Sequence, residues 1–161
     1  MINPTRPNGV EFQPVSPALI RVRLIGLVLT FVSVLIAGVV IFFLAGSWIP
    51  LAIAGAFAVL LLWLMWLVPR QVRAIGYCEG ADEFLITTGI MFRELTVIPY
   101  GRVQFVDVNE GPIARMYGIT SITLHTASAE TAGKLEGLPA AEAARLRDML
   151  ASRGSAEQAG L

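Results

Sequence analysis

The chain has 161 residues, of which 55% are hydrophobic and 15% are charged, and its formal net charge is zero. An average soluble domain has about a quarter of its residues charged, so this composition indicates a membrane protein. The absence of excess positive charge argues against a nucleic-acid partner. A single Cys and a single His cannot form an internal disulfide or a multi-histidine metal site, and we expect no metal and no cofactor.

The first 20 residues are interrupted by prolines at positions 4, 7, 14 and 17. Proline lacks a backbone N–H, so this spacing disfavours both helix and strand pairing. The sequence therefore predicts an extended N-terminal tail over residues 1–20.

An uncharged stretch follows, with no Asp, Glu, Lys, Arg or His from Leu24 to Pro69. A helix needs about 20 apolar residues to cross a bilayer, so the stretch is long enough for two crossings. The segment Gly46–Pro50 contains the Gly, Ser and Pro residues that favour a break. We predict a transmembrane helical hairpin over residues 21–70, with one leg from Leu24 to Ala45 and the other from Ile49 to Val68. Small residues recur at spacings of four in both legs, and they favour packing within the hairpin or, alternatively, oligomerisation.

Basic and aromatic residues mark the ends of this hairpin. Arginines stand before the first leg and after the second, whereas the turn has no charge. The positive-inside rule therefore predicts that both termini and the following domain are cytoplasmic. The expected membrane-interface anchors are Arg21, Arg23, Trp48, Trp66, Arg70 and Arg73.

Residues 71–153 change to a pattern of short strands and one amphipathic helix, which predicts a single α+β domain. The expected strands are Ala74–Cys78, Phe84–Thr88, Glu94–Ile98, Gly101–Asn109, Thr120–Thr126 and Lys134–Leu138, with a helical turn at Ile113–Gly118 and a polar loop at Ala127–Thr131. The helix is expected to begin at Pro139 and to end at Gly154, which leaves residues 154–161 as a C-terminal tail.

The segment from Val97 to Val108 reads VIPYGRVQFVDV, and it resembles the "IPYxRIQxVDV" strand pair of the membrane-anchored bacterial pleckstrin-homology (PH) domain family. Further motifs of that family follow in its order: Gly111–Ile113, Arg115–Ile119, Leu124–Ser128 and Glu136–Leu138. The resemblance covers about residues 20–153. It implies a PH-like domain, an antiparallel sheet or barrel with a C-terminal helix, after two transmembrane helices in the plasma membrane of a bacterial cell.

The strand around residue 105 has apolar side chains on both of its faces. Val103 and Phe105 alternate with Val106 and Val108, whereas a one-sided sheet would show polar residues towards solvent. We therefore take Val103, Phe105 and Arg115 as a candidate interaction surface. The alternative is that these motif residues hold the fold, with Arg115 paired to a sheet carboxylate such as Asp107 and with Tyr100 and Gln104 satisfying backbone groups at strand ends.

These observations favour a noncatalytic, membrane-tethered interaction or assembly module, either an accessory subunit of a larger membrane complex or a homo-oligomer. Catalysis is disfavoured because His125 has no paired Cys and no evident acid to orient it. The alternative is a lipid-sensing PH domain at the inner leaflet. The loop expected to face lipid phosphate in that case carries Glu79, Asp82 and Glu83 and no base, which argues against headgroup binding.

Overall fold

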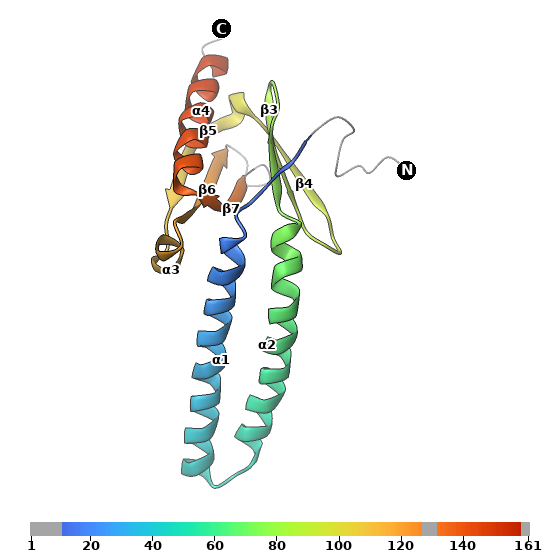
Figure 1. Ribbon diagram of the computed structural model, residues 1–161, viewed down its shortest axis with the longest axis vertical. Helices are drawn as coiled ribbons and strands as arrows, with labels where there is room; N and C mark the ends of the chain where they lie inside the picture. The colour runs from blue at the N-terminus through green and yellow to red at the C-terminus, as the bar shows by residue number, and fades with distance from the viewer. Residues whose placement is uncertain (1–10, 127–131, 159–161) are drawn as a thin grey trace. The chain divides into compact units, whose positions relative to one another are not determined.

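The structure is a computed structural model that describes residues 11–126 and 132–158 (Figure 1). The predicted loop 127–131, the first ten residues of the predicted N-terminal tail and the last three residues of the chain lie outside this range. In chain order the elements are β1 (Gln13–Pro14), α1 (Ala18–Ala45), α2 (Ile49–Arg73), β2 (Gly76–Glu79), β3 (Glu83–Thr88), β4 (Glu94–Pro99), the 3-10 turn η1 (Tyr100–Arg102), β5 (Val103–Asn109), α3 (Pro112–Met116), β6 (Ile119–Thr126), β7 (Gly133–Pro139) and α4 (Ala140–Gln158). They divide into a helical unit, Ile20–Arg70, and a second unit formed by Met1–Leu19 together with Gln71–Leu161.

The helical unit is a pair of long apolar helices, α1 and α2, joined by a short turn in which Gly46 has a positive φ of 60°. Both helices are long and apolar enough to cross a membrane. The helices contact each other where Gly38 faces Ala54, because a Cβ added at Gly38 would lie 2.7 Å from the Ala54 Cβ. The small residues thus serve packing within the hairpin.

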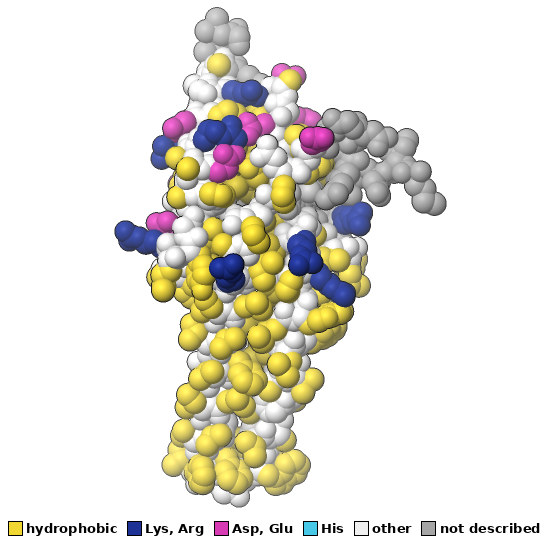
Figure 2. Space-filling view, in the orientation of Figure 1, with side chains coloured by type: hydrophobic (Ala, Val, Ile, Leu, Met, Phe, Trp, Pro, Cys, Tyr) yellow, Lys and Arg dark blue, Asp and Glu magenta, His cyan; other side chains and the backbone are white. Residues whose placement is uncertain are grey.

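The surface of this helical unit is what a hydrocarbon environment requires. Hydrophobic side chains cover the helices in the lower part of Figure 2, and no charged side chain is visible there. The hydroxyls of Thr30 and Ser33 donate to the carbonyls of Gly26 and Leu29, at 2.9 and 2.7 Å. These polar groups are therefore satisfied within their own helix, as they must be where water is absent.

Both helices extend beyond the predicted legs. Helix α1 begins at Ala18, where the Ser16 hydroxyl accepts a hydrogen bond from the Ala18 N–H at 3.3 Å and so caps the first turn. Helix α2 continues through Pro69 to Arg73. A proline inside a helix removes one backbone hydrogen bond without ending the helix, so α2 runs past Val68, where the second leg was expected to end.

The prediction of an extended tail up to residue 20 was also wrong for its second half. Strand β1 adds to the first sheet, with Gln13 opposite Tyr77 and Pro14 opposite Gly76. Val15 is buried, and the Ser16 N–H donates to the Gly137 carbonyl at 2.8 Å. Pro14 did not prevent pairing because an edge strand pairs on one side only, which tolerates a missing donor.

The second unit is the predicted α+β domain, built from two antiparallel sheets. The first has the strand order β1-β2-β3-β4, and the second has the order β5-β6-β7. The sheets pack against each other across Gly133 of β7, where an added Cβ would lie 2.6 Å from the Ile98 Cδ1 and 3.0 Å from the Ile86 Cδ1. Larger side chains at position 133 would separate the sheets, so a glycine fits here. The predicted strands are confirmed, with ends shifted by a few residues.

Helix α4 packs on β5, β6, β7 and η1 and closes the core. Ala143, Leu146 and Leu150 are buried on its inner face. The prediction that the helix ends at Gly154 was wrong, because α4 continues to Gln158. Gly154 is buried instead, and a Cβ there would lie 3.3 Å from the Tyr100 carbonyl oxygen, so this glycine permits close helix packing rather than a helix stop.

Candidate interaction surfaces

A β-bulge between Val103 and Phe105 turns the side chains of these two residues to opposite faces of strand β5. Val103 pairs with Thr126 and Phe105 with His125, so two residues of β5 advance while β6 advances one. Such a bulge reverses the inside and outside positions that strict alternation predicts. Val103 is consequently buried at 5% exposure, whereas Phe105 is 53% exposed. Val103 therefore belongs to the core and not to a surface.

The outer face of β5 and β6 carries a cluster that we call the Phe105 patch: Phe105, Asp107 and His125. The Phe105 ring stacks on the imidazole with a centroid distance of 4.2 Å and an interplanar angle of 10°. The His125 Nε2 lies 3.0 Å from an Asp107 carboxylate oxygen. His125 therefore does have an acid beside it, on the neighbouring strand, contrary to the sequence-based expectation.

Arg115, the third residue of the predicted surface, lies on α3 with its side chain 80% exposed. Its Nε is 3.9 Å from a carboxylate oxygen of Glu110, which lies just after β5, so the expected pairing with a sheet carboxylate such as Asp107 was wrong. The three predicted residues therefore do not form one contiguous surface. The structure leaves two of them, Phe105 and Arg115, exposed on different elements.

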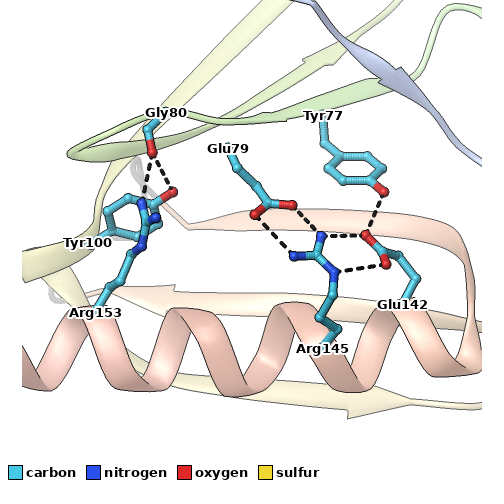
Figure 3. A network of polar contacts seen from close by, with 7 residues as sticks. All are labelled: Tyr77, Glu79, Gly80, Tyr100, Glu142, Arg145 and Arg153. Atoms are coloured by element: carbon cyan, nitrogen blue, oxygen red, sulfur yellow. Dashed lines mark hydrogen bonds and ion pairs between the residues drawn. The ribbon is translucent and has the colours of Figure 1, made fainter.

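A polar network fastens α4 to strand β2 (Figure 3). The Arg145 guanidinium reaches across to Glu79 and also pairs with Glu142 of its own helix, at 2.6 Å. The Tyr77 hydroxyl donates to Glu142 at 3.1 Å. Hydrogen bonds from Arg145 and Tyr77 lower the pKa of Glu142, and burial together with the Glu142 carboxylate raises the pKa of Tyr77 to about 12.

A second contact of α4 closes the β2–β3 loop. Arg153 donates to the carbonyls of Gly80 and Ala81, at 2.9 and 3.1 Å, and its guanidinium carbon lies 4.9 Å from the Tyr100 ring centroid. The Tyr100 hydroxyl also donates to the Gly80 carbonyl, at 3.1 Å. The sequence-based alternative that Tyr100 satisfies a backbone group is confirmed.

The two α4 arginines that reach the β2–β3 loop, Arg145 and Arg153, are therefore already engaged. The depression beside this loop has a volume of about 1130 Å³ and is lined by Glu11, Glu79, Asp82, Glu83 and Arg145, among others. Four acids surround one arginine that is paired with two carboxylates. A phosphate group would be repelled from this site. Among the described residues, no group of three or more His, Cys, Asp or Glu side chains is arranged to hold a metal ion.

The predicted membrane-interface residues lie at the ends of the long helices. Trp48 is exposed at the hairpin turn, and Trp66 is exposed near the other end of α2. The Arg70 guanidinium carbon stacks over the Trp66 ring at 3.7 Å, so that both side chains form one amphipathic group. Arg21 is exposed, and Arg23 is half-buried in α1.

Sequence reasoning missed two features that depend on pairing across the chain. The Asp107–His125 pair requires the register of β5 and β6, and the Arg145–Glu79 pair joins residues far apart in the sequence. The available signal was the helical spacing of Glu142 and Arg145, which places both on the same polar stripe. It could not indicate which strand that stripe faces.

The family model for the bacterial PH domain matches residues 18–154, which is most of the chain. The chain is also 29% identical over 87 residues to the UPF0699 transmembrane protein YdbS of Bacillus subtilis (strain 168). That match covers 53% of this chain and 54% of the relative, so the chain spans about half the length of the curated protein it matches. No solved structure matches the chain. The matched family model, which spans both apolar helices and the two-sheet domain, shows that this chain belongs to the bacterial PH-domain family.

Proposed function

We propose that this membrane-associated PH protein is a noncatalytic docking module, tethered by its hairpin to the plasma membrane, and that it binds a protein partner in the cytoplasm through the Phe105 patch. The observation that carries the proposal is an aromatic side chain more than half exposed on the outer face of a sheet. Exposed aromatic residues are enriched at protein interfaces, where they act as anchors.

The surroundings of Phe105 suit a protein partner. The ring is held by the stack on His125, so it loses little conformational freedom on binding. Asp107 beside it, and the Lys134–Glu136 pair on the outer face of β7, supply a polar rim with both signs of charge. An apolar anchor inside a polar rim is the usual anatomy of a transient interface.

Headgroup sensing at the inner leaflet is the weaker alternative. The β2–β3 loop that would face a lipid phosphate is acidic, and its carbonyls are bound by Arg153. An anionic surface attracts a polybasic segment by about 1 kcal/mol for each Lys or Arg, and this loop has none.

The test is a photo-crosslinking amino acid placed at position 105 of the full-length protein in living cells. We expect adducts at position 105 and none at position 97, an exposed control site on β4 of the other sheet. The mass of the adduct identifies the partner, since a second copy of this chain adds 17.4 kDa. A heavier adduct identifies a different protein, as an accessory subunit would require.

The variant Phe105→Ser complements the crosslink. The ring is exposed, so the expected loss of stability is that of one cross-strand pair, about 0.2–1 kcal/mol, while co-purification of the partner in mild detergent is lost. Val97→Ser, the matched control, removes an exposed apolar side chain from the other sheet and retains the partner. A large drop in melting temperature with the partner still bound would show that Phe105 is core, and the proposal would fail.

The cytoplasmic orientation is a separate part of the proposal. We expect Ser47→Cys in the hairpin turn to react with an impermeant thiol reagent added to intact cells, and Ser155→Cys in α4 to react only after lysis, both in a Cys78→Ser background. If only position 155 were labelled in intact cells, both termini would lie outside the cell, and the proposed orientation would be wrong.

A further inference from the structure

Two loops of the PH domain expose large apolar side chains. Met91 and Phe92, between β3 and β4, are 86% and 90% exposed. Met116, at the end of α3, is 83% exposed, and the exposed Tyr117 follows it. Surface turns normally carry Gly, Pro, Asn, Asp or Ser, and neighbouring exposed Met and aromatic side chains mark a contact with an apolar surface.

The backbone of the β3–β4 loop holds its apolar residues at the tip. Gly89 has a φ of +91°, and a Cβ there would lie 1.8 Å from the Phe92 carbonyl oxygen. The chain therefore folds back sharply over four residues, which only glycine permits. Met91 and Phe92 are presented outward by this turn instead of folding back onto the sheet.

The β3–β4 loop lies at the end of the sheet where helix α2 joins the domain. Gly76, the first residue of β2, comes three residues after the last residue of α2, Arg73. Gly76 pairs with Thr87, and Thr88 is the last residue of β3 before the loop. The register of this strand pair thus places the loop beside the point at which the chain arrives from the membrane helix.

The α3 loop is tied to the part of the domain around Leu19, where the chain leaves the domain. The Gly118 carbonyl accepts a hydrogen bond from the Ala140 N–H at 3.3 Å, which ties the end of the α3 loop to the end of β7. A Cβ on Gly137 of β7 would lie 2.9 Å from Leu19, in the first turn of α1. Both exposed apolar loops therefore belong to the end of the domain that carries its two connections to the membrane.

We propose that the side chains of Met91, Phe92, Met116 and Tyr117 insert into the headgroup–acyl boundary of the leaflet from which α1 and α2 emerge. The attraction is apolar and not headgroup-specific. Arg93 is followed by Glu94, and Arg115 lies beside Glu110, so neither loop presents unbalanced positive charge. Aromatic and apolar side chains on a surface of this kind bind the interface by burying apolar area.

The experiment uses the full-length protein in nanodiscs of phosphatidylethanolamine and phosphatidylglycerol. A nitroxide spin label is attached at Phe92→Cys, at Met116→Cys or at Asp82→Cys, each in a Cys78→Ser background. Position 82 is the matched control, because it is exposed in the β2–β3 loop at the other end of the same sheet. Relaxation by oxygen, which partitions into lipid, is compared with relaxation by a water-soluble nickel chelate.

We expect an oxygen-to-nickel accessibility ratio severalfold higher at positions 92 and 116 than at position 82. We expect the same ordering in nanodiscs of phosphatidylcholine alone, since the loops need no anionic lipid. A water-like ratio at either site would overturn the proposal, as would a high ratio that disappears without anionic lipid. Protection from both reagents would indicate a protein contact and would also overturn it.

Discussion

The β2–β3 loop and the β3–β4 loop are successive connections at opposite ends of one sheet, and helix α4 holds the first whereas the second is exposed. Arg153 binds the carbonyls of the β2–β3 loop, and Arg145 pairs with Glu79 at its edge. The β3–β4 loop instead exposes Met91 and Phe92. The comparison shows that α4 uses its arginines to hold the β2–β3 loop against the domain, whereas the β3–β4 loop keeps large apolar side chains available for a contact.

The β2–β3 loop is held only while helix α4 stays packed on the sheets. Leu146→Asp should remove that support and unfold the domain, because Leu146 is fully buried and an unpaired charge in the core costs several kcal/mol. The measurement is thermal unfolding of the full-length protein in mild detergent, followed through hydrogen exchange of the strands. Ala151→Asp, which adds the same residue at an exposed position of α4, should leave the transition nearly unchanged. An unaltered melt for Leu146→Asp would refute the packing of α4.

Arg145→Met should loosen the β2–β3 end alone. The substitution keeps the apolar stem and removes the guanidinium that joins Glu79 to Glu142. Because the side chain of Arg145 is about half exposed, we expect the free energy of unfolding to fall by only about 1 kcal/mol. Hydrogen exchange at residues 79–82 should become faster. Arg147→Met is the control, since Arg147 pairs only with the adjacent Asp148 among the interactions described. Equal exchange in both variants would mean that the network does not order the loop.

The smallest effect at neutral pH is expected from titration of the same network. The pKa of Glu142 is lowered from 4.5, so its contribution to stability is present above pH 4.5 and is lost as the pH falls through the lowered pKa. The pKa of Tyr77 is raised from 10.0 to about 12, so its contribution is present below pH 10.0 and is lost as the pH rises towards 12. Urea unfolding across the pH range measures both losses, which form the acid limb and the alkaline limb of the stability profile.

Matched variants separate the two limbs. Glu142→Gln should flatten the acid limb, and Tyr77→Phe should flatten the alkaline limb. If neither limb changes in its variant, the pH dependence arises from other groups and the network has no linked role.

Much of the architecture could be predicted from the sequence because its signals are local. The uncharged run from Leu24 to Pro69 specifies two apolar helices, and the alternation along β6 specifies a strand with Ile122 and Leu124 inside. The Val97–Val108 motif identifies the family. Each of these inferences needs only neighbouring residues, since side-chain period and hydropathy are properties of short segments.

The candidate surfaces could not be predicted in the same way, because each depends on how distant segments meet. One extra residue in β5 moves Val103 into the core and leaves Phe105 outside, and no alternation pattern reveals a bulge. Gly154 has the sequence signature of a helix stop, yet it is the site where α4 approaches the Tyr100 carbonyl.

The sequence alone determined the apolar hairpin, the positions of six strands along the chain, the amphipathic helix and the family, since all of these follow from composition, period and local motifs. Only the tertiary structure decided that residues 13–14 join the first sheet, that His125 has Asp107 beside it, and that the β2–β3 loop is held by Arg153. It also placed Met91 and Met116 at the same end of the domain. The physical reason is that register, bulges and helix packing are set by the total burial of the assembled domain, which no single segment encodes.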